Sequence, residues 1–165
     1  MLLAATDKGV CALLFADDAS ELERQLAERF AAAERTRDDT GLGDWLREVI
    51  IQLEEPEQAA HLPLDLHGSA FQLRVWRALT RIPSGETRRY GELAEQLGTH
   101  PRAIARACAS NNVGLLVPCH RVVGGTGEGG YRWGLPRKRE LLRREGGSSD
   151  AGELRHRADQ DQHPE

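Results

Sequence analysis

The feature of this sequence that most constrains its fold is a change in the sign of the charge near residue 67. Residues 1–67 hold 6 Lys/Arg against 15 Asp/Glu, whereas residues 68–145 hold 14 Lys/Arg against 6 Asp/Glu. This division favours a basic, polyanion-binding module joined to an acidic partner domain. A merely solvated arginine-rich surface would give the same counts, so charge alone leaves both interpretations open. A chain of 165 residues can form one domain or two small ones.

Composition and cysteine spacing exclude several classes of protein. With 39% hydrophobic and 29% charged residues the composition is ordinary for a soluble protein, and no apolar run reaches membrane-spanning length. The N-terminus lacks the pattern of a secretory signal, so we expect a cytoplasmic protein with no membrane partner. Three cysteines without paired spacing (Cys11, Cys108 and Cys119) argue against a disulfide framework and a structural zinc, and we expect no metal.

The acidic part has the pattern of a small α+β domain over residues 1–63. Residues 2–15 predict a hairpin that turns at residues 7–9 and buries Cys11 as inert packing. Asp18 and Glu21 then have the spacing of a helix cap. The apolar residues that follow at helical spacing predict two helices, marked by Leu22, Leu26 and Phe30 and by Trp45, Leu46, Val49, Ile50 and Leu53. No catalytic motif is visible here.

The basic part predicts a mostly helical domain over residues 64–146. Ser69 and Gln72 form a capping-box pattern ahead of a helix that carries Phe71, Val75, Trp76 and Leu79. Two short helices around Gly98, residues 90–97 and 102–110, resemble a helix-turn-helix. A last helix is expected from Pro136 to about Glu145. The polar tail, residues 147–165, is expected to be disordered.

The second helix of that pair has an unusually thin surface. Alanine recurs along residues 102–110, and Arg102 and Arg106 are the only long charged side chains there. Small residues allow a helix backbone to approach a minor groove, where contacts are largely independent of base sequence.

A cysteine and a histidine stand together in Pro118-Cys119-His120-Arg121. Proline fixes one backbone angle, so we expect Cys119 at a constrained bend rather than in a helix. A thiolate is a nucleophile, and a neighbouring proton acceptor assists its formation. Considered alone, such a cysteine is more often a small buried hydrophobe.

Taken together, these residues resemble the O6-alkylguanine-DNA alkyltransferases, the methylated-DNA–protein-cysteine methyltransferases, and most closely the bacterial adaptive-response type. The resemblance runs from about Leu64 to Glu145. It is carried by Phe71-Gln72, Val75-Trp76, Ile82-Pro83, Gly85-Glu86-Thr87, Tyr90, Asn111, Pro118-Cys119-His120-Arg121 and Tyr131-Arg132-Trp133-Gly134. It implies an α+β fold with a ribonuclease-H-like N-terminal domain, here lacking its first strand, and a helical C-terminal domain with a helix-turn-helix.

The resemblance implies direct, stoichiometric and self-inactivating repair of double-stranded DNA by a monomer without a cofactor. The substrate would be O6-alkylguanine, and O4-alkylthymine is a second substrate that the resemblance allows. The damaged nucleotide would be flipped out of the duplex. Cys119 matches the alkyl acceptor, and His120 the residue that takes the thiol proton through a water. Glu145 would orient His120, Asn111 would stiffen the turn before the cysteine, and Tyr90 would protonate guanine N3.

The resemblance also implies two further sets of residues. DNA contacts are expected at Arg102, Arg106, Gln72, Arg89, Gly91 and Ala103. The alkylguanine pocket would be lined by Cys108, Val122, Tyr131, Arg132, Trp133 and Gly134. Arg102 is the expected finger that fills the gap in the base stack, and Arg106, one turn later, is the alternative. The chain departs from the family pattern in a shortened Gly98–Pro101 turn, a shortened loop before Tyr131, and a bulky Trp133 that would exclude large alkyl groups.

Two other functions fit the sequence less well. A non-catalytic lesion sensor of the same fold would lack the cysteine, so Cys119 argues against it. A cysteine hydrolase would need Cys119 and His120 as a direct pair, but adjacent side chains of an extended segment point to opposite sides. A hydrolase would also leave the basic helix pair unexplained.

Overall fold

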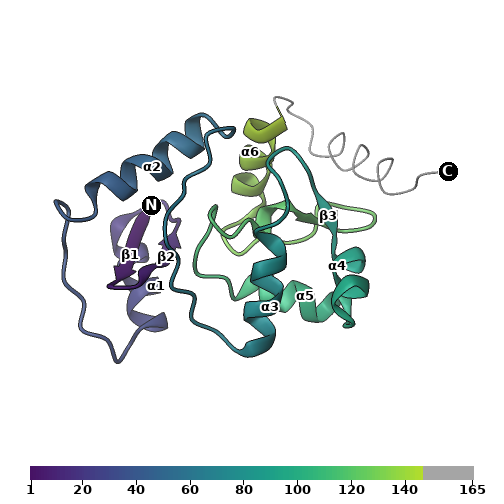
Figure 1. Ribbon diagram of the computed structural model, residues 1–165, viewed down its shortest axis with the longest axis horizontal. Helices are drawn as coiled ribbons and strands as arrows, with labels where there is room; N and C mark the ends of the chain where they lie inside the picture. The colour runs from purple at the N-terminus through teal and green to yellow at the C-terminus, as the bar shows by residue number, and fades with distance from the viewer. Residues whose placement is uncertain (147–165) are drawn as a thin grey trace. The chain divides into compact units, whose positions relative to one another are not determined.

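The computed structural model describes residues 1–146, and the tail expected to be disordered lies outside the described residues. Over these residues the fold is mixed α+β, with helices and two small two-stranded sheets (Figure 1). The chain divides into two compact units. The first contains residues 1–67 and 112–114, and the second contains residues 68–111 and the described chain from residue 115. The division falls where the charge changes sign.

The first unit is built on the predicted hairpin. Strands β1 (Leu2–Thr6) and β2 (Gly9–Leu14) are antiparallel, with Leu2 opposite Leu14 and every residue of β2 buried. Gly9 has φ +149°, and a Cβ there would lie 2.5 Å from the Pro63 carbonyl oxygen. A glycine is needed because the extended segment around Leu64 pairs with β2, where the Val10 N–H donates to Pro63 O at 2.8 Å.

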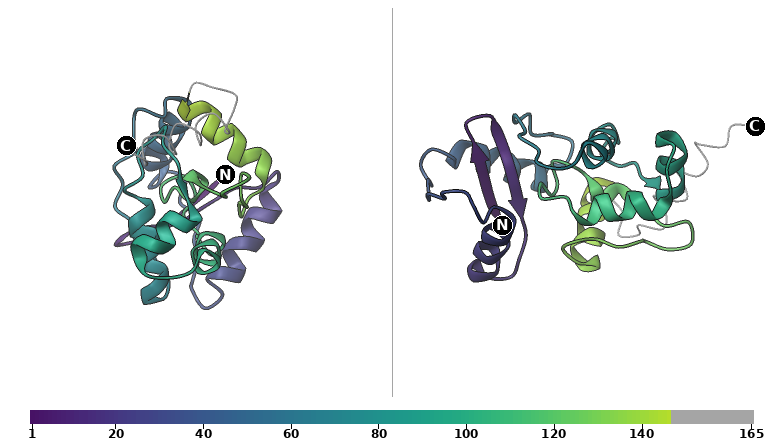
Figure 2. Two further views of the ribbon diagram at one scale, coloured as in Figure 1. Left: turned by 90° about the vertical axis from the view of Figure 1, so that its right-hand side faces the viewer. Right: turned by 90° about the horizontal axis from the view of Figure 1, so that it is seen from below.

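Two helices accompany the hairpin. Helix α1 (Ala19–Arg29) packs against β2 (Figures 1 and 2). It begins where the Asp18 carboxylate accepts a hydrogen bond from the Glu21 N–H at 2.8 Å. Helix α2 (Gly43–Glu54) buries Val49, whereas Ile50 stays exposed. Both helices and the cap of α1 confirm the predictions.

A short return of the chain to the first unit was not foreseen. Val113 pairs in parallel with Leu13 of β2, and the Leu13 N–H donates to Asn112 O at 2.8 Å. The chain then re-enters the second unit through Leu115, which has φ +66°. Residues 112–114 therefore belong to the first unit although they stand only a few positions before Cys119.

The second unit contains the predicted helices. Helix α3 (Ala70–Leu79) has the capping box of Ser69 and Gln72, and the Trp76 indole donates to Ala107 O at 2.8 Å. Helices α4 (Tyr90–Leu97) and α5 (Pro101–Ala109) pack together on either side of Gly98, whose φ of +68° ends α4. Helix α6 (Leu135–Gly146) closes the described chain.

A small parallel sheet of β3 (Arg88–Arg89) and β4 (Val122–Val123) was not predicted. It joins the segment before α4 to the segment after the cysteine. Within residues 1–146 no helix is both long and apolar enough to span a membrane.

Candidate active site

Cys119 begins a single 3-10 turn, η1 (Cys119–Arg121), which the Arg121 N–H closes by donating to Pro118 O at 3.0 Å. The expectation of a bend outside any helix is therefore wrong. Proline lacks an N–H but keeps a carbonyl, so Pro118 can stand just before a helical turn. The turn is helical, so the extended-strand argument that Cys119 and His120 point to opposite sides does not apply. Cys119 is 2% exposed and His120 is fully buried.

Asn111 holds the cysteine from the end of α5. Its side-chain amide donates to the Cys119 Sγ at 3.3 Å and to the Val117 carbonyl at 3.0 Å. Burial raises the pKa of Cys119 to about 11, although Asn111 and the Lys138 ammonium act in the opposite direction. The thiol is therefore the resting form at neutral pH, and a nucleophilic role requires a base.

His120 is paired with a carboxylate from the end of α6. Its Nε2 lies 2.7 Å from Glu145 Oε1, and the Glu145 side chain is 3% exposed. The Arg121 guanidinium donates to both Glu145 oxygens, at 2.8 and 3.1 Å. Burial alone would raise the pKa of Glu145, but His120 and Arg121 outweigh it and lower that pKa to about 2. The group at this position is therefore a carboxylate at neutral pH.

The protonation of His120 follows from these contacts. Burial lowers the pKa of His120 despite the opposing effect of Glu145, so the imidazole is neutral at neutral pH. Nε2 then carries the hydrogen and donates it to Glu145. Nδ1 has no hydrogen-bond partner among the described residues and is left as a proton acceptor.

Tyr90, the first residue of α4, lies against the loop that follows β4. Its hydroxyl lies 3.4 Å from the Gly130 carbonyl oxygen, and a Cβ at Gly129 would come within 2.6 Å of its ring. Burial raises the pKa of Tyr90 to about 12. The phenol is therefore a hydrogen donor at neutral pH.

The predicted pocket residues form an aromatic cluster connected to the cysteine turn. The Tyr131 ring meets His120 edge to face at a centroid distance of 6.4 Å and Trp133 at 5.5 Å. Arg132 lies 4.9 Å from the Trp133 ring centroid and donates to Asn111 O at 2.6 Å. Of the remaining three, Val122 and Cys108 are buried, and Gly134, with φ +96°, precedes α6.

The predicted DNA-contact residues lie outside this network. Helix α5 exposes Arg102, Ala105, Arg106 and Ala109 along one face. Ala103 is half-buried beside them. Gln72 is occupied by the cap of α3 and by a hydrogen bond of 3.0 Å to the Ser110 hydroxyl, and Arg89 pairs with Glu92.

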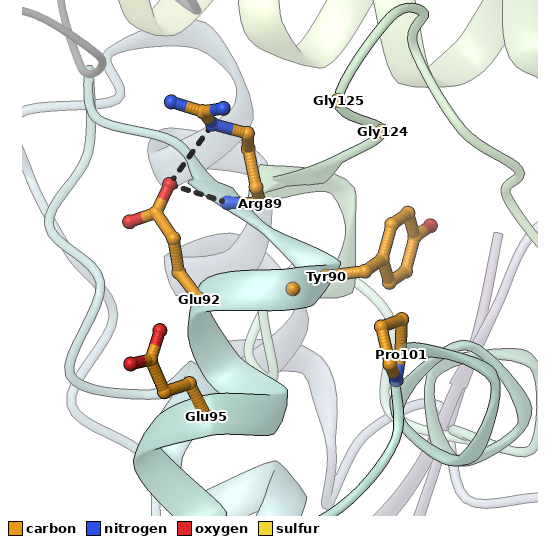
Figure 3. Close-up of a pocket in the computed structure, with 8 residues that line it drawn as sticks. Arg89, Tyr90, Glu92, Glu95, Pro101, Gly124 and Gly125 are labelled. Carbon is orange, nitrogen blue, oxygen red and sulfur yellow. Dashed lines mark hydrogen bonds and ion pairs between the residues drawn. The ribbon is translucent and has the colours of Figure 1, made fainter.

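A concave pocket of about 740 Å³ lies at the start of α4. Its walls, drawn in Figure 3, combine four residues near the start of α4 with Glu95, Pro101 and the glycines after β4. Three predicted residues (Arg89, Tyr90 and Gly91) line it, whereas Cys119 does not. The pocket therefore adjoins Tyr90 rather than the thiol.

Sequence reasoning assigned no role to two buried cations of this site, Arg121 and Lys138. Lys138 is fully buried and donates to the carbonyls of Val122, Glu128 and Gly130. It stands seven residues before Glu145 on α6, a spacing that places both on one helix face. That spacing in the sequence could have indicated that Lys138 lies on the same side of the helix as Glu145 and belongs to the site. Among residues 1–146 no group of three His, Cys, Asp or Glu side chains could hold a metal ion.

Comparison with known proteins identifies relatives of most of the chain. Residues 70–147 match the family model described as 6-O-methylguanine DNA methyltransferase, DNA binding domain. The chain is 46% identical over 147 residues to the bifunctional transcriptional activator/DNA repair enzyme Ada of Escherichia coli, with 87% of this chain and 42% of that protein covered. It is 36% identical over 157 residues to the methylated-DNA–protein-cysteine methyltransferase of Candida albicans, with 88% of this chain and 90% of that protein covered.

A solved structure agrees with these relatives. The Mycobacterium tuberculosis protein OGT in complex with DNA matches with a TM-score of 0.69 and 33% identity, covering 90% of this chain and 88% of that one. Our chain spans less than half the length of the Escherichia coli relative.

Proposed function

The chain belongs to the family of methylated-DNA–protein-cysteine methyltransferases, and on this premise we propose that it repairs O6-alkylguanine in double-stranded DNA by direct transfer to Cys119. The thiolate attacks the alkyl carbon, so that an S–C bond forms and the C–O6 bond breaks. The bonding electrons leave with guanine, which takes up a proton. No cofactor enters this balance. Cys119 ends as a thioether, so each molecule acts once.

The observation that carries the proposal is the buried series of Cys119, His120 and Glu145. A thiol with a pKa of about 11 is ionised at pH 7 only on the order of one molecule in ten thousand. His120 would take the thiol proton at Nδ1 through an intervening water. The Glu145 carboxylate, 2.7 Å from Nε2, then stabilises the imidazolium that results.

The leaving guanine needs a proton, and in this proposal Tyr90 would supply it. Its phenol is protonated at neutral pH, and Tyr90 is one of the residues that line the pocket of Figure 3. Asn111 supports the reaction differently, because its amide fixes the Sγ and the backbone before the turn. Tyr131, Arg132 and Trp133, with Val122, Cys108 and Gly134, would enclose the alkyl group, and Trp133 would exclude large ones.

DNA binding is proposed for the surface of α4 and α5, acting as a helix-turn-helix. The exposed face of α5 presents Ala105 and Ala109 beside Arg102 and Arg106, so its backbone can approach a minor groove. Arg102 would enter the gap left by the flipped nucleotide. Gln72, Arg89, Gly91 and Ala103 would contact the adjacent backbone.

For the domains we propose that residues 64–146 are the alkyltransferase and DNA-binding domain. Residues 1–63 would be a ribonuclease-H-like partner domain. The change in charge sign supports this division, because only the second part is basic.

The test is transfer of a methyl group from duplex DNA that contains O6-methylguanine. The intact mass should rise by one methyl group, and peptide mapping should place that methyl on Cys119. Cys119→Ala should abolish transfer and keep DNA binding. Cys11→Ala, which alters a cysteine in β2 of the first unit, should transfer normally. An unmodified Cys119 peptide after incubation would refute the proposal.

A second experiment identifies the finger. Arg102→Ala and Arg106→Ala are compared for single-turnover rate and for affinity to undamaged duplex. The finger is the arginine whose loss slows transfer far more than it weakens binding. A phosphate contact would lower affinity and rate together. Equal losses for both variants would contradict the assignment to Arg102.

A further inference from the structure

Lys138 is a buried cation whose hydrogen bonds all go to backbone. Its side chain is fully buried on α6, and its ammonium donates to the carbonyls of Val122 at 2.6 Å, Glu128 at 2.5 Å and Gly130 at 2.9 Å. An ammonium has three donors, so these three bonds saturate it. A buried charge is retained only where such partners compensate for the loss of water. The residue is therefore built into the fold rather than carried on its surface.

The three carbonyls belong to two segments that Lys138 ties together. Val122 lies in β4, directly after the cysteine turn. Glu128 and Gly130 lie in the loop of residues 124–130, which contains five glycines. Glycines give a loop many accessible conformations, so a loop of this composition does not hold one shape by itself.

Another anchor of the loop is weaker. The Arg139 guanidinium pairs with the Glu128 carboxylate at 2.8 Å, and the Arg139 side chain is 56% exposed. Exposed pairs of this kind stabilise little. Lys138 is thus the stronger candidate for fixing the position of the loop.

The position of the loop decides where Tyr90 lies. The Gly130 carbonyl that accepts from Lys138 also faces the Tyr90 hydroxyl at 3.4 Å, and Gly129 lies against the Tyr90 ring. The Lys138 ammonium itself is 5.9 Å from the centroid of that ring. A shift of the loop would remove the surface on which Tyr90 rests.

We propose that Lys138 is a positioning residue, whose ammonium fixes residues 124–130 to β4 and so holds Tyr90 where it can protonate the departing guanine. The structural half of this inference stands on the contacts alone, and its catalytic half rests on the proposed function. The charge of Lys138 also assists the proposed transfer in a second way, because the ammonium favours the thiolate form of Cys119.

The test is Lys138→Met, which keeps the apolar stem and removes the three donors. Amide hydrogen exchange should accelerate in residues 124–130, and single-turnover transfer should slow by about tenfold or more while DNA affinity changes by less than about twofold. Arg139→Met is the matched control, since it removes the exposed anchor of the same loop. It should change transfer by less than about twofold.

Chemical rescue separates positioning from loss of the fold. Lys138→Ala leaves room for n-propylammonium, which supplies the missing three carbons and the charged donor. The amine should restore transfer, and 1-propanol at equal concentration should not. Equal effects of the amine and the alcohol, or no rescue of a variant that retains its thermal transition, would overturn the inference.

The outcomes also separate this inference from the proposed function. If the wild type transfers methyl and Lys138→Met transfers equally fast with unchanged exchange, the inference fails and the function stands. If the wild type transfers nothing but exchange accelerates in the variant, the function fails and the structural tie stands.

Discussion

The two units of the molecule differ in where their charged side chains lie, at the surface in the first unit and also in the interior in the second. In the first unit the ion pairs join side chains close in sequence, and most of them are exposed, such as Arg24 with Glu21 and Glu28. Its buried residues are apolar apart from Gln52 and Asn112. The second unit buries His120, Arg121 and Lys138 together with the Glu145 side chain.

This difference indicates which part of the chain to search for catalytic residues when no ligand is bound. An exposed pair gains little from its attraction, because water already solvates both partners. A buried ionic group is expensive to desolvate, so its retention indicates either a structural tie or a reaction. We propose that the second unit contains both kinds.

The largest effect should come from removing one buried charge. Glu145→Gln leaves the Arg121 guanidinium without its anionic partner, and we expect a loss of about 3 kcal/mol in the free energy of unfolding. Transfer to Cys119 should also slow strongly. Urea denaturation and single-turnover kinetics measure the two effects. Glu140→Gln is the matched control on α6, because Glu140 pairs with Arg143 and Arg144 in the open. Equal urea midpoints for the two variants would break the comparison.

The next effect should appear with pH. The folded pKa of Glu145 is about 2 against an ordinary 4.5, and the pKa of His120 is lowered from 6.5. As pH falls below 6.5 the unfolded chain binds a proton that folded His120 does not, and below 4.5 the same holds for Glu145. The free energy of unfolding should therefore decline with acidification, by about 3 kcal/mol for Glu145 between pH 4.5 and 2.

Salt and the Glu145→Gln variant show whether this decline comes from buried groups. Urea titrations at several pH values are run with and without about 0.5 M NaCl, which screens exposed charges and leaves buried pairs nearly unaffected. The decline should persist in salt and become shallower in the variant. A decline that vanishes in salt would place its origin in the exposed pairs instead.

The smallest effect should come from the first unit. Arg24→Gln removes a guanidinium that bridges Glu21 and Glu28 on the surface of α1. Water solvates the carboxylates that lose their partner, so the urea midpoint of the variant should stay within error of the wild-type value. A clear loss of stability would show that exposed charges matter here, and the contrast between the units would need revision.

Much of the fold could be predicted because its signals are local. The cap at Asp18, the capping box at Ser69 and the glycine after α4 each act within one helical turn. The order of motifs along the chain also indicated Cys119, His120 and Glu145 together, and the last two are in contact.

What could not be predicted depends on partners distant in sequence. The strands β3 and β4 have two residues each and carry no periodicity. Lys138 is held by backbone carbonyls, which every residue type has, so the sequence does not indicate which residues supply them. The helical turn at Cys119 was missed because proline restricts the residue before it and leaves the residue after it open.

The return of residues 112–114 to β2 has a consequence for anyone who wishes to shorten this protein. A fragment cut to the range of the family model, residues 70–147, would lose the strand with which Val113 pairs. The Gly114 N–H and the Asn112 carbonyl, both bonded to Leu13, would lose their partner. Asn111, which holds the Cys119 sulfur, is the next residue in the chain. A fragment that keeps the hydrogen-bond partners of residues 112–114 therefore includes the N-terminal hairpin.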